Sequence, residues 1–175
     1  MKSITRALTL VVLLGGCATK TADNPRLELT DVGFALHLPP AMQQALDSLA
    51  PGFHAVRASS FRSDVSQAVA ANGGAGLPAA FAAVGDFDHD GSADAVVEGT
   101  TASDSALRVI AILNRKTPVA MEVTRFPVYD ADAVGIYVST PPAGTTGAFE
   151  VVAYPDSTLL YQYSPDGFQG RNLGS

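Results

Sequence analysis

The chain has 175 residues, of which 47% are hydrophobic and 16% are charged, with a formal net charge of −6 and a single cysteine. An acidic protein is poorly suited to binding polyanions through charge, so we expect no nucleic-acid partner. A single cysteine also excludes an intramolecular disulfide. Stability must therefore come from a hydrophobic core and from any metal that the chain binds.

The first sixteen residues have the pattern of a secretory signal peptide. Lys2 and Arg6 provide a positive start, and Ala7–Leu14 is an apolar run. This run is too short to cross a bilayer as a helix, which takes about 20 residues. The next residues, Leu14-Gly15-Gly16-Cys17, resemble the lipobox of bacterial lipoproteins. The resemblance implies cleavage before Cys17 and acylation of its thiol and new amino terminus.

Such an anchor determines where the protein is expected to reside. Each methylene buried in a membrane contributes about 0.8 kcal/mol, so several acyl chains on Cys17 hold a protein firmly. In lipoproteins a residue other than Asp after the cysteine implies outer-membrane sorting, and here that residue is Ala18. We therefore predict a lipid-anchored protein of the bacterial cell envelope, on the outer membrane and facing the periplasm or the surface. The alternative is a soluble secreted protein with a chance cysteine.

Cleavage leaves 159 residues with 9 basic and 17 acidic side chains, a formal charge of −8. This length predicts one domain. Residues 17–26 are polar and are predicted to be a lipidated tether, followed by a single domain over residues 27–175. Gly33–Leu38 alternates apolar and polar residues and predicts a strand.

One amphipathic helix is predicted next. Met42, Ala45, Leu46 and Leu49 have helical spacing after Pro39-Pro40, and Pro51-Gly52 follows them. Phe53–Phe61 is predicted to be a strand. Residues 64–71 are ambiguous, with a brief helix capped by Asp64 as one interpretation.

From residue 79 onward the pattern is almost entirely that of β-strands. We expect seven strands, at residues 79–84, 95–98, 107–113, 119–126, 135–139, 149–154 and 158–163. Their connections are short and rich in turn-forming residues, which favours antiparallel neighbours. The predicted fold class is α+β, with one N-terminal amphipathic helix packed on a mostly antiparallel β meander.

Residues 85–97, GDFDHDGSADAVV, contain the one pattern with clear chemistry. Asp86, Asp88 and Asp90 alternate, Gly91 allows a backbone conformation with positive φ, and Asp94 follows. Calcium takes six to eight oxygen ligands at about 2.3–2.6 Å, and carboxylates this close in the chain repel one another without a cation. The pattern therefore predicts a calcium-binding hairpin over residues 79–99.

An EF-hand is excluded, because its bidentate ligand at loop position 12 is replaced by Val97 and the flanking residues do not form amphipathic helices. Strand–DxDxDGxxD–strand instead resembles the calcium hairpin of FG-GAP/VCBS repeats. The resemblance implies ligands from Asp86, Asp88, Asp90 and Asp94 and from the carbonyl of Ser92. The chain departs from that family in having one copy of the motif, too few for a propeller.

The alternatives for this loop are an acidic surface turn that binds nothing, a magnesium site, or calcium that regulates or bridges to a ligand. Nucleophile-elbow, zinc-protease and phosphate-loop motifs are absent from the sequence. We therefore predict a non-enzymatic envelope lipoprotein in which calcium stabilises the hairpin. Its partners are the membrane, through the lipid anchor, and an envelope protein or a glycan. The alternative function is a calcium-dependent hydrolase or carbohydrate-binding module whose loop organises a substrate site.

Overall fold

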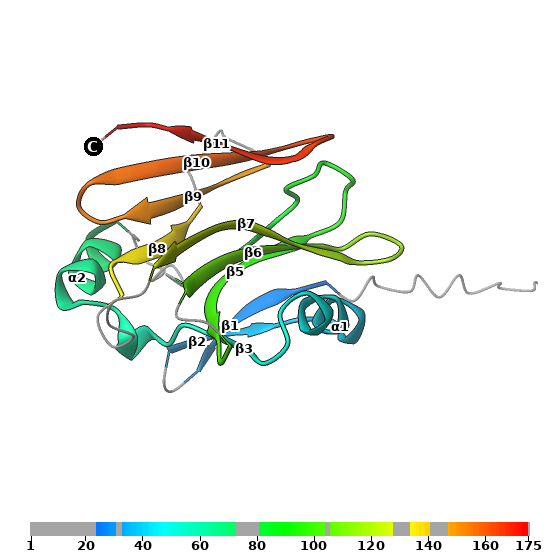
Figure 1. The fold of residues 1–175 in the computed structure, drawn as a ribbon, viewed down its shortest axis with the longest axis horizontal. Coiled ribbons are helices and arrows are strands. Elements are labelled where there is room, and N and C mark those ends of the chain that lie inside the picture. Colours follow the sequence, from blue (N-terminus) through cyan, green and yellow to red (C-terminus); the bar gives the residue numbers. More distant parts are fainter. Residues whose placement is uncertain are drawn as a thin grey trace, which may run out of the picture.

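The computed structural model describes residues 24–30, 33–72, 81–103, 106–127, 134–140 and 147–174. The predicted signal peptide, the lipidation site at Cys17 and most of the predicted tether lie outside these ranges. The described residues form two α-helices and three β-sheets (Figure 1). Neighbouring strands within each sheet pair antiparallel. No helix within the described ranges has the length and apolar character needed to cross a membrane.

The central sheet is built on strands β5 and β6, which are buried along most of their length. Its strand order is β3-β5-β6-β7, and β4 pairs with the same edge of β5 as β3 does. The five strands are β3 (Phe53–Ala55), β4 (Ala82–Gly85), β5 (Asp94–Thr101), β6 (Ala106–Leu113) and β7 (Val119–Pro127).

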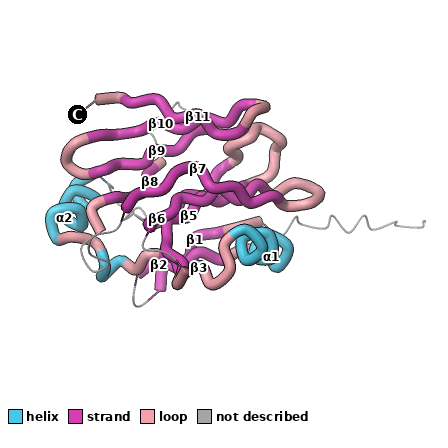
Figure 2. The backbone as a smooth tube through the Cα atoms, in the orientation of Figure 1, coloured by secondary structure: helices cyan, strands magenta, loops and turns pink. Residues whose placement is uncertain are grey.

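A second sheet, of order β11-β10-β9-β8, lies against one face of the central sheet (Figure 1). Its strands are β8 (Ile136–Ser139), β9 (Ala148–Ala153), β10 (Ser157–Ser164) and β11 (Gly167–Asn172). The opposite face is covered by helix α1 (Pro40–Leu49) and by a two-stranded hairpin of β1 (Arg26–Thr30) and β2 (Gly33–His37). Helix α2 (Ser63–Asn72) follows a short 3-10 turn (Ala58–Ser60), and Figure 2 shows α1 and α2 at opposite ends of the molecule.

This three-layer arrangement produces two hydrophobic cores. Residues of β5 alternate between them, with Ala95 and Val97 in the first core and Val96 in the second. On β6, Ile110 and Ile112 face the first core, and neighbouring residues face the second. A strand buried on both faces needs apolar residues at almost every position, which explains the nearly continuous apolar run in this strand.

The structure differs from the sequence prediction in several elements. The strands divide into three sheets, where one meander was predicted. Arg26, predicted as the last tether residue, begins β1, whose residues are mostly exposed and therefore lack a buried pattern. The strand predicted over residues 53–61 ends at Ala55. Helix α2 begins at Ser63, so Asp64 lies inside its first turn and not at the cap.

Candidate metal centre

The predicted calcium loop connects β4 to β5 across a closed hairpin. Gly85 pairs with Asp94, so residues 86–93 form the connection, and Asp94 is the first residue of β5. Phe87 is buried in the second core, where its ring meets Phe149 edge-on at 5.4 Å between centroids. This aromatic contact anchors the loop to the second sheet, and the residues on either side of it are the acidic ones.

Three of the predicted acidic ligands come together in space. Asp86, Asp88 and Asp94 each offer a carboxylate oxygen, and the three oxygens all lie within 4.8 Å of one another. Two oxygens on opposite sides of a calcium ion lie about 4.6–5.2 Å apart. The three carboxylates are therefore close enough to bind one such ion together.

The other two predicted ligands have different contacts. Asp90 is exposed and lies outside the group of three, and its carboxylate accepts a hydrogen bond of 2.8 Å from the backbone N–H of Ser92. The Asp90 N–H in turn donates to the carboxylates of Asp86 and Asp88, at 3.1 and 3.2 Å. Asp90 and Ser92 thus shape the loop around the three clustered acids.

Asp94 is fully buried, and the side chain of Asp88 is also only 1% exposed. One carboxylate oxygen of Asp94 accepts the N–H of Phe87 at 2.9 Å and that of Asp88 at 3.3 Å, and the other accepts the N–H of Asn114 at 2.8 Å. Burial raises the pKa of Asp94, and these backbone hydrogen bonds act in the opposite direction. The side chain therefore ties the loop to the turn between β6 and β7.

Two residues of the loop have positive φ. Gly91 has φ +87°, and no atom lies within 4 Å of where its Cβ would be, so backbone conformation alone accounts for glycine here. His89 has φ +61°, which is uncommon for a residue with a side chain. A Cβ on Gly147 would collide with the His89 ring, so the imidazole packs directly against the backbone that leads into β9.

Arg115, in the β6–β7 turn, is the cation that contacts this group. Its Nε donates to Asp88 at 2.7 Å, and its terminal nitrogen donates to the Tyr163 hydroxyl at 2.7 Å. The guanidinium also lies 5.2 Å from the centre of the Tyr163 ring. The hydrogen bonds to Tyr163 and Asp88 raise the pKa of Arg115, so it remains a cation beside the carboxylates.

Sequence reasoning missed the roles of Asn114, Arg115 and Tyr163. They lie 20 to 69 residues after Asp94 in the chain, and no spacing rule connects them to the loop. Figure 1 shows why they meet: the β4–β5 loop, the β6–β7 turn and the β10–β11 turn lie at the same end of the molecule. The three carboxylates of Asp86, Asp88 and Asp94 outnumber the single positive charge of Arg115, so the group carries a net negative charge when the acids are ionised.

Comparisons of this chain with protein families, with characterised proteins and with solved structures find no match.

Proposed function

We propose that this chain is a non-enzymatic envelope lipoprotein, anchored through Cys17, whose domain binds one calcium ion in the loop at residues 86–94. The observation that carries the proposal is the spacing of the carboxylate oxygens of Asp86, Asp88 and Asp94, which are within 4.8 Å of one another. Carboxylates are hard oxygen ligands, and alkaline-earth cations prefer such ligands.

Calcium fits this donor set better than magnesium. Calcium accepts irregular geometry and several protein oxygens, and a compact loop of carboxylates and backbone groups can supply them. Magnesium demands near-ideal octahedral geometry and retains several waters. Asp90 and the Ser92 carbonyl, which the FG-GAP/VCBS resemblance adds to the ligand set, would complete the shell by a local adjustment of an exposed loop.

A structural role for the ion follows from what its ligands already contact. Asp94 accepts hydrogen bonds from one segment of the loop, Phe87–Asp88, and from the β6–β7 turn, and Asp88 is ion-paired with Arg115. An ion bound by these acids would cross-link the loop to the start of β5, where Asp94 is already hydrogen-bonded to the β6–β7 turn. Within the described ranges, the groups that hydrogen-bond Asp88 and Asp94 from the β6–β7 turn are the Asn114 amide and Arg115, which also contacts Tyr163; these groups position the acids and do not form a nucleophile–base pair.

The loop is also close in space to the start of the domain. The Asn114 side chain donates a hydrogen bond of 3.3 Å to Asn24, and the Asn114 backbone N–H donates to Asp94. Asn24 lies seven residues after Cys17, and seven residues extend at most about 25 Å. On a lipidated protein the calcium site would therefore lie near the membrane surface.

The test is thermal unfolding of the chain from residue 17 onward carrying Cys17→Ser, which contains every residue that the structure describes. With calcium at about 1 mM and a dissociation constant of about 0.1 mM, mass action stabilises the folded state by about 1.4 kcal/mol. For a domain of this size that corresponds to a rise in Tm of about 3–5 °C.

The ligand variant is Asp86→Asn, which keeps the shape of the side chain and one acceptor oxygen but loses its charge. We expect it to abolish most of the calcium-dependent rise in Tm. The matched control is Asp156→Asn, in the exposed turn between β9 and β10, which should leave the rise intact. A Tm that does not respond to calcium, or an equal response in Asp86→Asn, would exclude the proposed site.

A further inference from the structure

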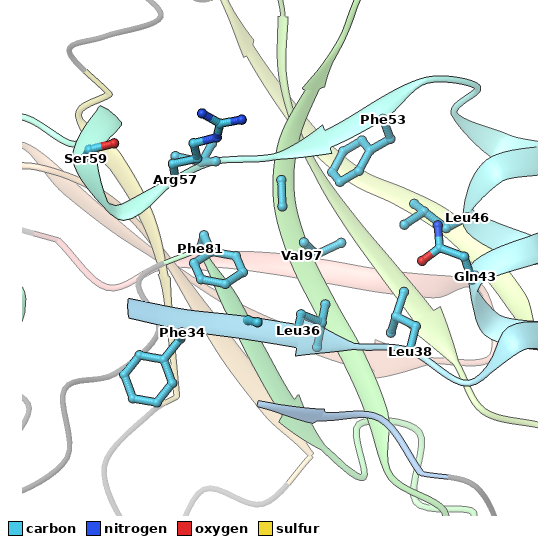
Figure 3. Close-up of a pocket in the computed structure, with 13 residues that line it drawn as sticks. Phe34, Leu36, Leu38, Gln43, Leu46, Phe53, Arg57, Ser59, Phe81 and Val97 are labelled. Atoms are coloured by element: carbon cyan, nitrogen blue, oxygen red, sulfur yellow. The ribbon is translucent and has the colours of Figure 1, made fainter. Parts of the chain in front are cut away.

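A second feature, unconnected to the loop, is an apolar cleft of about 670 Å³ beside the first hydrophobic core. It lies between β2, α1 and β3, and it falls within the range of about 300–1,000 Å³ that is usual for small-molecule sites. Figure 3 shows Leu36 on β2 and Leu38 just after it along one wall, with Phe53 and Leu46 across from them.

The bottom of the cleft is also apolar. Phe81 and Val97, which both belong to the buried first core, line it between the two walls (Figure 3). The amide of Gln43, another lining residue, is already hydrogen-bonded to Asp47 at 2.8 Å. Apart from Gln43, Arg57 and Ser59 the lining side chains are apolar, so the cleft is suited to a hydrocarbon chain.

Arg57 gives one end of the cleft a positive charge. It is the one charged residue in the lining, which contains no acid, and it lies with Ser59 at the end opposite Gln43 and Leu38 (Figure 3). Arg57 is exposed, and its guanidinium points outward from this end and away from Phe81, so it is placed to meet a carboxylate that stays at the solvent-facing mouth of the cleft (Figure 3). Its guanidinium has no ion pair or hydrogen bond to a side chain in the described parts of the protein. In an acidic domain, an unpaired cation at the end of an apolar cleft is complementary to a ligand with an anionic head and an apolar tail.

We propose that this cleft binds a single-chain fatty acid, with its carboxylate at Arg57 and its hydrocarbon chain along the partly exposed side chains of Leu36, Leu38 and Phe53. Arginine suits this task, because its planar guanidinium binds a carboxylate through two parallel hydrogen bonds. The chain would cover apolar surface that now faces solvent in the cleft, which is the main source of affinity. The site goes beyond the proposed function, since the lining includes no residue of the calcium loop.

The experiment uses the chain from residue 17 with Cys17→Ser, so that purification needs no detergent to compete for the cleft. The probe is 11-(dansylamino)undecanoic acid, whose fluorescence rises in an apolar site, displaced by dodecanoate or by dodecanol. We expect saturable 1:1 binding with a dissociation constant on the order of 10 µM. Arg57→Gln should weaken dodecanoate binding about tenfold, with little effect on dodecanol.

A second variant tests the location. Ala55 lines the cleft and is exposed, so Ala55→Trp fills the space without disturbing the core. It should abolish binding of both competitors. His54→Trp, at the exposed neighbouring position outside the lining, is the matched control and should bind normally. Equal Tm values for the variants would show that folding is unaffected.

Three results would overturn the proposal. Absence of saturable binding would show that the cleft takes no fatty acid, and full binding by Ala55→Trp would place the probe elsewhere. Equal effects of Arg57→Gln on dodecanoate and dodecanol would exclude recognition of the carboxylate. A dimer that Ala55→Trp dissociates, without fatty-acid binding, would identify a second copy as the occupant. None of these results bears on the calcium-dependent Tm, so the two proposals fail independently.

Discussion

Glu98 is predicted to make the stability of this domain fall as the pH rises. It lies in the middle of β5 and has no exposed surface, and within the part of the chain that the structure describes neither of its carboxylate oxygens has a hydrogen-bond partner. The nearest cation along the ladder, Arg108, pairs with Gly99 in the register and so lies on the opposite face of the sheet. Burial without a partner raises the pKa of Glu98 well above its ordinary value of 4.5.

The sign of the effect follows from linkage. The folded state holds a proton on Glu98 at pH values where the unfolded chain has released it. The stabilising contribution of the protonated group is therefore fully present below pH 4.5 and is lost as the pH rises toward the folded-state pKa. Within that window the free energy of unfolding falls by about 1.4 kcal/mol per pH unit from this group alone.

The perturbation is Glu98→Gln, which removes the titration and keeps the shape and polarity of the side chain. Below the ordinary pKa of the carboxyl, we expect the two proteins to differ by no more than about 1 kcal/mol, because each buries a neutral polar group. Above it, the variant should become progressively more stable than the parent, by about 1.4 kcal/mol per pH unit.

The assay is urea unfolding of both proteins at closely spaced pH values, with the difference in free energy plotted against pH. Taking the difference cancels every group that titrates equally in the two proteins. Glu150→Gln is the internal comparison: burial also raises the pKa of Glu150, but the side chain is only partly buried, so its slope should be smaller. A difference between Glu98→Gln and the parent that does not change with pH would refute the reasoning.

Three further predictions concern other residues. Cys17→Ser should move the protein from the membrane fraction to the soluble fraction and abolish labelling with an alkyne-tagged palmitate; a variant still labelled would exclude this anchor. Gly99→Ala should lower the stability by about 2–4 kcal/mol in urea unfolding, because a Cβ there would collide with the His54 carbonyl of β3; an unchanged midpoint would contradict that contact. Arg115→Gln should strengthen calcium binding several-fold in calorimetry, because the cation competes for Asp88, and should lower metal-free stability by about 1 kcal/mol; weaker binding would show that Arg115 supports the site.

Much of the secondary structure was predictable because the burial pattern appears directly in the residue types. The continuous apolar run of β6 and the helical spacing of Met42 and Leu46 match elements whose apolar faces are buried. β1 and β11 were missed for the opposite reason, since both are mostly exposed and their residues carry little periodic signal. The division of the strands among three sheets depends on contacts between strands far apart in the chain, which local patterns do not specify.

For the candidate site, the sequence alone determined the loop, its acidic residues and the need for Gly91, because alternation and positive φ are local properties of the chain. Only the tertiary structure decided that Asp86, Asp88 and Asp94 converge while Asp90 does not, and that Arg115 and Tyr163 reach them. It also buried Glu98 without a hydrogen-bond partner among the described residues and formed the cleft beside Arg57. The physical reason is the same in each case: charge pairing and burial depend on distances in space, and folding brings together residues that are far apart in the sequence.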